Sequence, residues 1–319
     1  MKIVIPDGLG LNPGDLSYEN FEVLGDFTAY DSTKESELIE RIHDADAVCI
    51  NDIMISREVM DQCPNLKYVG CLSTGFNTVD LEAATEKGIV VTNVPTYGTA
   101  SVSEFAITLL MEVAHRAGDH SLGVHNGRWN EVGEWCYWDS EQIELAGKTM
   151  GILGMGRIGK QTSKVAQAMG MNVLGYDIYH DESIVCETFR YGELDEVLAK
   201  SDVIVLHCVL TPETEGIINK ENIAKMKDGV IIINNSRGPL VVPEDLAEGL
   251  NSGKVFGAGL DVMLTEPPAP DNPLLKCDNC IITPHISWVS KASRGRLLNT
   301  AAENLKQFIA GNTVNQVNK

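Results

Sequence analysis

The sequence predicts an α/β protein built from two doubly wound parallel sheets. Short apolar runs rich in Val and Ile alternate with amphipathic helical stretches along the chain, and this alternation is typical of βαβ units. The apolar runs are continuous rather than alternating, as in parallel strands that helices cover on both faces. The chain has 319 residues, 44% of them hydrophobic, and at about 150 residues per domain this length predicts two domains.

The first hundred residues predict one small sheet. Apolar runs indicate strands at 3–5, 47–50, 68–72 and 89–92, separated by helical stretches at 36–43, 57–63 and 80–87. Because helices alternate with the strands, we expect this sheet to be parallel.

A long helix is expected to follow, because Ser101 and Glu104 have the Ser-x-x-Glu spacing of a capping box ahead of an apolar stretch. A second series of apolar strands then runs from 150–153 through 173–176, 203–207, 230–234 and 255–260 to 280–283, and 294–308 has the spacing of an amphipathic helix. The chain is therefore expected to leave the first domain near residue 100 and return near residue 287. This predicts a discontinuous domain of residues 1–99 and 287–319, with 100–286 inserted into it.

Composition excludes several classes of function. The 25 basic and 45 acidic residues give a net charge of -20, which disfavours nucleic-acid and anionic-membrane partners. No apolar run reaches the roughly 18 residues of a membrane span, and the apolar run at the N-terminus is too short for the hydrophobic region of a signal peptide, so we expect a soluble, cytoplasmic protein. Cys277 and Cys280 lack a second ligand pair. His115, His120 and His125 are spaced by five, which turns each about 140° from the last on a helix, so no metal site is predicted.

A glycine-rich turn carries the first functional signal. The motif GMGRIG at 154–159 directly follows a strand and opens a helix, and Asp177 ends the next strand 18 residues beyond Gly159. This context predicts a Rossmann domain that binds a dinucleotide, with the pyrophosphate at the helix N-terminus and the acid on the ribose hydroxyls. A carboxylate repels a 2′-phosphate, and Ile178 and Tyr179 add no cation. NAD is therefore favoured over NADP.

Three chemically apt residues follow later strands of this domain. Arg237 follows the strand at 230–234, Glu266 comes after the strand at 255–260, and His285 follows the strand at 280–283. Because open α/β sheets bind ligands at the carboxyl ends of their strands, we expect these side chains to meet. They suit reduction of a 2-oxo acid: Arg237 clamps the carboxylate, His285 exchanges the proton, and Glu266 orients the imidazole and favours its protonated form.

The ordered motifs resemble those of the D-isomer-specific 2-hydroxyacid dehydrogenase family: GMGRIG with Asp177, NSRG at 235–238, LTEPP at 264–268 and TPHIS at 283–287. The resemblance implies a homodimer, a Rossmann NAD-binding domain inserted into a smaller flavodoxin-like substrate domain, and an active site between the two domains. It implies that Arg237, Glu266 and His285 are catalytic. The cofactor-binding residues it implies are Gly154, Gly156, Arg157, Ile158, Gly159, Asp177, His207, Cys208, Asn235, Ser236 and Asp261, the last holding the nicotinamide carboxamide.

The substrate loop is expected at Ser73, Thr74, Gly75 and Asn77, which follow a strand of the first domain. Gly75 would let successive N–H groups turn toward an anion, and in the family the matching loop binds the substrate carboxylate. Phosphoglycerate dehydrogenases typically carry an arginine two residues before this loop, where this chain has Cys71. No regulatory segment follows residue 319 either, so a phosphorylated substrate is disfavoured.

The sequence also resembles one branch of the family. WCYWD at 135–139 and HISW at 285–288 are similar to the glycerate dehydrogenase (hydroxypyruvate reductase) branch. The family resemblance places the segment 120–145 at the dimer contact, and Trp138 and Trp288 suit either the interface or the active site.

Two alternatives to this branch stay open at this stage. One keeps the mechanism and changes the pocket, as in D-lactate or D-3-phosphoglycerate dehydrogenase. The other is an NAD(H)-sensing binding protein like the transcriptional corepressors that share this fold, which the strong negative charge argues against.

Overall fold

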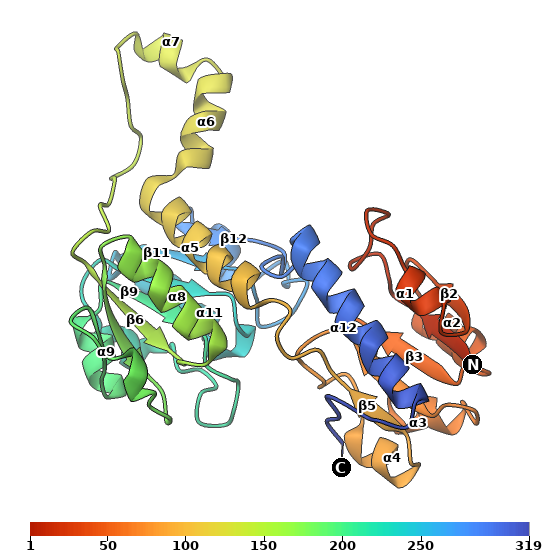
Figure 1. Cartoon of the computed structure of the whole chain (residues 1–319). Helices are drawn as coiled ribbons and strands as arrows, with labels where there is room; N and C mark the ends of the chain where they lie inside the picture. Colours follow the sequence, from red (N-terminus) through yellow and green to blue (C-terminus); the bar gives the residue numbers. More distant parts are fainter. Residues whose placement is uncertain (319) are drawn as a thin grey trace. The chain divides into compact units, whose positions relative to one another are not determined.

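The computed structural model describes residues 1–318, and the chain divides into two compact units (Figure 1). Unit 1 comprises Met1–Gly98 and Trp288–Lys319, and unit 2 comprises Thr99–Ser287. Within the described residues, no helix combines the length and the apolar character that crossing a membrane requires.

Unit 1 is a five-stranded parallel sheet in the order β2-β1-β3-β4-β5, the order of a flavodoxin-like fold. The central strands β3 and β4 are buried throughout, which explains their continuous apolar sequences. The strands are β1 (Lys2–Ile5), β2 (Asp26–Ala29), β3 (Ala47–Ile50), β4 (Tyr68–Cys71) and β5 (Val90–Thr92), and the helices are α1 (Glu19–Glu22), α2 (Glu35–Ile42), α3 (Arg57–Asp61), α4 (Leu81–Glu86) and α12 (Lys291–Ile309).

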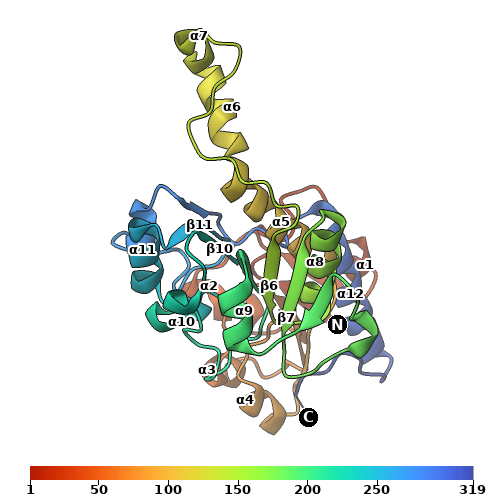
Figure 2. The same ribbon diagram turned by 90° about the vertical axis from the view of Figure 1, so that its left-hand side faces the viewer.

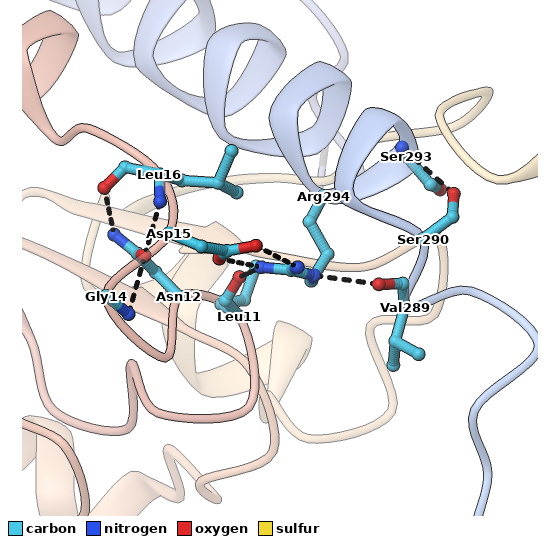
Figure 3. A network of polar contacts seen from close by, with 9 residues as sticks. All are labelled: Leu11, Asn12, Gly14, Asp15, Leu16, Val289, Ser290, Ser293 and Arg294. Atoms are coloured by element: carbon cyan, nitrogen blue, oxygen red, sulfur yellow. Dashed lines mark hydrogen bonds and ion pairs between the residues drawn. The ribbon is translucent and has the colours of Figure 1, made fainter.

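Helix α12 packs the returning segment against this sheet through a buried apolar face that includes Leu297, Ala301 and Leu305. Arg294, at its first turn, holds the loop after β1 (Figure 3). Its guanidinium donates to both carboxylate oxygens of Asp15 at 2.7 and 2.8 Å, and to the carbonyl oxygens of Leu11 and Val289. The hydrogen bond from Arg294 lowers the pKa of Asp15, so the pair stays charged at neutral pH.

Unit 2 is a seven-stranded parallel sheet in the order β12-β11-β10-β9-β6-β7-β8, the Rossmann order with one added strand. Helices α5 and α8 bury one face of the sheet, and α9, α10 and α11 bury the other (Figure 2). The strands are β6 (Thr149–Leu153), β7 (Asn172–Tyr176), β8 (Phe189–Tyr191), β9 (Val203–Leu206), β10 (Val230–Asn234), β11 (Val255–Leu260) and β12 (Cys280–Ile282). The helices are α5 (Thr99–His115), α6 (Ala117–His125), α7 (Arg128–Val132), α8 (Arg157–Ala168), α9 (Leu194–Lys200), α10 (Lys220–Lys225) and α11 (Pro243–Ser252), with short 3-10 helices at Glu182–Ile184, Gly238–Leu240 and Pro273–Lys276.

The structure corrects three details of the predicted elements. Strands β2 and β8 were not predicted, because both lie at sheet edges and are short and partly exposed. The capping box is wrong as well: α5 begins at Thr99, so Ser101 lies inside the helix. The Ser101 hydroxyl donates to the carbonyl oxygen of Ser287 at 2.7 Å, and Glu104 is exposed. A tertiary contact therefore uses the hydroxyl that the sequence pattern assigned to the cap.

Helices α6 and α7 form an arm that extends away from the sheet of unit 2 (Figures 1 and 2). Neither helix buries a residue. The arm is held in shape by polar contacts of its own, since Arg128 pairs with Asp139 at 3.0 Å and the Asp139 backbone N–H donates to Nε2 of His120. The segment that follows α7 completes the arm and leaves large apolar side chains exposed, including Trp135 at 86% and Trp138 at 68%.

Candidate active site

The turn between β6 and α8 needs its glycines for different reasons. Gly154 has φ +101°, and a Cβ there would collide with the backbone of Cys208, just after β9. A Cβ at Gly159 would collide with the carbonyl oxygen of Gly154. Gly156 is exposed and meets no atom of the chain within 4 Å of an added Cβ. The fold itself does not require that glycine, and the missing side chain leaves room for a ligand to approach the backbone.

The first turn of α8 offers backbone N–H groups to such a ligand. Gly156 is the N-cap residue and supplies no side chain to accept from them. Arg157 is exposed and Ile158 is half-buried beside this turn. An open glycine, free N–H groups and the positive end of a twelve-residue helix fit a pyrophosphate.

Asp177 follows β7 and is oriented by the glycine-rich turn. Its Oδ2 accepts from the backbone N–H of Met155 at 2.6 Å, and its Oδ1 accepts from the backbone N–H of Tyr179 at 3.1 Å. The carboxylate is half-buried at the end of its strand, and each oxygen has capacity for a further donor. This arrangement fits the ribose hydroxyls of a dinucleotide.

His207 and Cys208 follow β9 on the other side of the turn. Nε2 of His207 pairs with the Thr162 hydroxyl at 2.9 Å, and burial lowers the pKa of His207 to about 3, so the imidazole is neutral at physiological pH. Burial raises the pKa of the Cys208 thiol to about 11, which leaves it protonated. Both residues are therefore neutral wall groups, and no charge from them faces the turn.

The structure brings His285 and Glu266 together at the carboxyl ends of β11 and β12. Nδ1 of His285 lies 2.7 Å from Oε2 of Glu266, and Oε1 of Glu266 accepts from the backbone N–H of Met263 at 2.9 Å. The side chains remain 47% and 39% exposed, so a substrate can reach the imidazole. His285 has φ +55°, a conformation in which non-glycine residues are uncommon outside functional sites and turns.

The hydrogen bond between His285 and Glu266 shifts the pKa of each group in the direction that favours its charged form. The hydrogen bond to Glu266 raises the pKa of His285 above its usual 6.5, against the opposing effect of burial and of Arg237. Burial of Glu266 acts to raise its pKa, but hydrogen bonds from His285 and Met263 outweigh it, and the pKa of Glu266 is lowered. The imidazole of His285 therefore stays protonated up to a higher pH than a free histidine does.

Arg237 lies in the loop after β10, and its guanidinium makes few contacts with the described part of the chain. The side chain is exposed, its Nη1 donates only to the carbonyl oxygen of Ser236 at 2.7 Å, and it forms no ion pair within residues 1–318. The next residue must be glycine, because a Cβ at Gly238 would collide with the carbonyl oxygen of Met263. This close approach brings the loop after β10 against the loop that carries Glu266. The positive charge of Arg237 contributes to the lowered pKa of Glu266.

Asp261 has a structural task that the sequence did not reveal. It is 1% exposed, and its carboxylate accepts from the Thr283 hydroxyl at 2.6 Å and from the backbone N–H groups of Ile286 and Ser287 at 2.8 Å each. These three bonds bracket His285 on both sides. Asp261 therefore fixes the segment that holds the imidazole, and the implied contact with the nicotinamide carboxamide stays a prediction.

Asn235 and Ser236 occupy the loop between β10 and Arg237. The Asn235 amide donates to the carbonyl oxygen of Val102 at 2.8 Å and to the Ser287 hydroxyl at 3.2 Å, and its Oδ1 is buried without a partner in the described part of the chain. The Ser236 hydroxyl donates to the carbonyl oxygen of Cys208 at 2.9 Å. Both side chains brace neighbouring segments, and their contact with cofactor stays a prediction.

The predicted substrate loop follows β4 in unit 1. The Ser73 hydroxyl donates to the carbonyl oxygen of Gly75 at 2.6 Å, and the Thr74 hydroxyl donates to that of Val94 at 3.0 Å. Asn77 is exposed, and what this loop binds stays a prediction.

Sequence reasoning missed one carboxylate at the same edge of the sheet of unit 1. Asp7 follows β1 and accepts from the backbone N–H groups of Asn51, Asp52 and Ile53, which shapes the loop after β3. Burial raises the pKa of Asp7, and those hydrogen bonds oppose the rise. The signal was present in the sequence, because Asp7 comes directly after the first apolar run.

The chain is similar in sequence to a family of known dehydrogenases. Residues 107–287 match the family described as D-isomer specific 2-hydroxyacid dehydrogenase, NAD binding domain. The chain belongs to the D-isomer-specific 2-hydroxyacid dehydrogenase family. It is 58% identical to a hydroxypyruvate reductase of Blautia hydrogenotrophica over 100% of both chains, and 35% identical to a glycerate dehydrogenase of Methylorubrum extorquens over 99% of this chain and 98% of that one.

A solved D-2-hydroxyacid dehydrogenase structure shows the same fold. The D-lactate dehydrogenase from Aquifex aeolicus, complexed with NAD and lactic acid, superposes with a TM-score of 0.82 at 29% identity and covers 98% of this chain and 96% of that one. The chain is thus an NAD-dependent oxidoreductase that acts on a CH–OH group, as the motifs predicted. Within residues 1–318, no group of three or more His, Cys, Asp or Glu side chains is placed to hold a metal ion.

Proposed function

We propose that this dehydrogenase interconverts D-glycerate and hydroxypyruvate, or acts on the smaller 2-oxo acid glyoxylate. The observation that carries the proposal is the hydrogen-bonded pair of His285 and Glu266, together with the exposed guanidinium of Arg237, which forms no ion pair within residues 1–318, in a chain 58% identical to a hydroxypyruvate reductase. The three side chains supply what reduction of a 2-oxo acid needs from the protein: a carboxylate clamp, a proton donor and a group that keeps the donor protonated.

Each of the three residues has a separate task. The fork of Arg237 binds the substrate carboxylate through parallel N–H bonds and polarises the carbonyl next to it. Nε2 of His285 donates its proton to the carbonyl oxygen during reduction and takes it back during oxidation. Glu266 holds Nδ1, so that Nε2 is the nitrogen that faces substrate. When bound, the cofactor supplies a hydride from its nicotinamide ring during reduction and accepts one during oxidation.

We also propose where the chain binds that cofactor. The pyrophosphate lies at the first turn of α8 over Gly156, the adenosine ribose lies at Asp177, and the nicotinamide lies near Asn235, Ser236 and Asp261. The open space at Gly156 and the oriented carboxylate of Asp177 support this placement.

We propose that Ser73, Thr74, Gly75 and Asn77 of unit 1 contribute the remaining substrate contacts, and that unit 1 is the substrate domain. A phosphorylated substrate is disfavoured because Cys71, which stands two residues before this loop, is uncharged and buried.

A steady-state screen tests the substrate. The purified protein is assayed with NADH against hydroxypyruvate, glyoxylate, pyruvate and 3-phosphohydroxypyruvate. The highest specificity constant is expected for hydroxypyruvate, with glyoxylate next. A preference for pyruvate or for the phosphorylated acid would replace the proposed substrate while leaving the mechanism in place, and no NADH oxidation with any of the four acids would contradict the proposal altogether.

The pH dependence of reduction is predicted to follow His285. The specificity constant for reduction should be high while His285 is protonated and should fall as pH rises through its raised pKa, above the usual 6.5. Glu266→Gln keeps an acceptor for Nδ1 but removes the charge, so the falling limb should move to lower pH. The measurement is a pH profile of kcat/KM for both proteins, with Glu187→Gln, an exposed change before β8, as control. A profile unchanged by Glu266→Gln would contradict the assignment.

We further propose that the enzyme is a homodimer of the cytoplasm. The exposed apolar side chains of the arm, Trp135 and Trp138 among them, are what the core of a subunit interface contains. All eight cysteines lie within residues 1–318, where none forms a disulfide, which fits a reducing compartment. Light scattering on the purified protein should give twice the mass of the chain, and Trp135→Ser with Trp138→Ser should shift the mass toward the monomer.

A further inference from the structure

A lysine lies beside the predicted ribose site, and the structure shows it already neutralised. Lys160 is on the first turn of α8, where its backbone N–H donates to the carbonyl oxygen of Gly156. Its Nζ lies 2.5 Å from Oδ2 of Asp181, four residues after Asp177 in the same loop. Ile178 and Tyr179, which follow Asp177 directly, supply no cation, and the pair of Lys160 and Asp181 was not predicted.

Asp181 is held in place to make this contact. Its Oδ1 accepts from the Ser183 hydroxyl and from the Ser183 backbone N–H, and its own N–H donates to the Tyr191 hydroxyl. The hydrogen bond from Lys160 is the largest of several effects that lower the pKa of Asp181 to about 2. The carboxylate is therefore fully charged at physiological pH, and its position is set by the chain rather than by the lysine alone.

Lys160 is on the helix that begins just after the turn bound by Asp177, whose carboxylate accepts from the backbone N–H of Met155. The hydrogen bond to Asp181 raises the pKa of Lys160 most, and the charge of Asp177 adds to that rise. The negative charge at the end of β7 therefore favours the charged form of the ammonium. The Lys160 and Asp181 side chains are 35% and 36% exposed, so the flexible lysine stem can turn to another anion once Asp181 no longer holds it.

We propose that Asp181 is a specificity-determining residue for the cofactor, because it withholds Lys160 from the 2′-phosphate of NADP. Asp177 repels that phosphate directly, and Asp181 removes the nearby cation that could attract it. NADP is then rejected both by repulsion and by the absence of a partner for its phosphate. This inference rests on the proposed placement of the adenosine ribose at Asp177.

The test is a set of dissociation constants for NADH and NADPH, measured without substrate by the change in cofactor fluorescence. Asp177→Asn alone should weaken NADH binding and improve NADPH binding only slightly. Adding Asp181→Asn should improve NADPH binding by about tenfold or more, the usual worth of a charge-assisted hydrogen bond, and high salt should reduce this gain. Asparagine can still accept from Ser183, so the loop should keep its shape.

Two further variants decide the cause. Lys160→Gln, added to the double variant, should abolish the gain in NADPH affinity, because the gain requires the freed ammonium. Asp228→Asn removes the same charge from the pair with Lys254. These two residues precede β10 and β11, at the amino ends of the strands, so the change should leave the ratio of NADPH to NADH affinity unchanged.

The outcomes separate this inference from the proposals on which it depends. If Asp177→Asn leaves NADH binding unchanged, the placement of the ribose is wrong, and the inference falls with it. If Asp177→Asn weakens NADH binding but Asp181→Asn gives no gain for NADPH, or a gain that survives Lys160→Gln, the inference alone is wrong. Substrate identity does not enter, because no 2-oxo acid is present in the measurement.

Discussion

Replacing His285 with alanine is expected to lower turnover by about 10²- to 10⁴-fold, the usual contribution of a positioned general acid or base. The imidazole is the group that Glu266 keeps protonated, and it lies exposed at the carboxyl ends of the strands. Affinity for NADH should stay nearly unchanged, because the pyrophosphate and ribose contacts are proposed at other loops. The measurements are kcat for hydroxypyruvate reduction and the dissociation constant of NADH.

A matched control is His43→Ala, which removes an exposed imidazole from the end of α2 in unit 1 and should leave turnover unchanged. His285 has a positive φ, which alanine tolerates poorly, so the melting temperature and the affinity for NADH report whether the segment keeps its structure. His285→Asn, whose side chain accepts this conformation more readily, should lose turnover to the same degree. Near-normal turnover of either variant would remove His285 from the proton-transfer step.

The sequence predicted the features that depend only on which segments form strands and which residues come directly after them. Continuous apolar runs identified the buried central strands such as β3 and β10, because helices cover both of their faces. The same rule placed Arg237, Glu266 and His285 near one another, since the carboxyl ends of parallel strands share an edge. The edge strands β2 and β8 were missed because partial exposure leaves them without a continuous apolar run.

Contacts that depend on tertiary register could not be predicted. Asp261 meets Thr283 because β11 pairs with β12 with Leu260 opposite Ile282, and nothing in the local sequence gives that register. Lys160 and Asp181 are 21 residues apart and meet only through the turn from α8 into β7 and the loop after it. Ser101 matched a capping pattern, yet its hydroxyl donates to the carbonyl oxygen of Ser287, which is distant in the sequence. In each case a side chain forms a hydrogen bond with a segment that is remote in the sequence.

Arg237→Lys is the second change with a large expected effect, because it keeps the charge and removes the geometry. A guanidinium can bind a carboxylate through two parallel N–H bonds, whereas an ammonium acts as a point charge. Losing one charge-assisted hydrogen bond of about 1.5–3 kcal/mol should lower kcat/KM for the 2-oxo acid roughly 10- to 100-fold. The dissociation constant of NADH should change little, since the guanidinium itself forms no ion pair in the described chain that the substitution would break.

The control for Arg237→Lys is the same substitution at Arg190, whose guanidinium forms two hydrogen bonds to the carboxylate of Glu196 on the surface of unit 2. That change should leave both constants unaltered. If kcat/KM is also unaltered in Arg237→Lys, the fork does not bind the substrate carboxylate, and the clamp must be sought in unit 1. If the loss falls instead on NADH affinity, Arg237 serves the cofactor. A loss confined to use of the 2-oxo acid therefore ties the uncommitted guanidinium to the substrate, because a general positive charge at that position would survive the change to lysine.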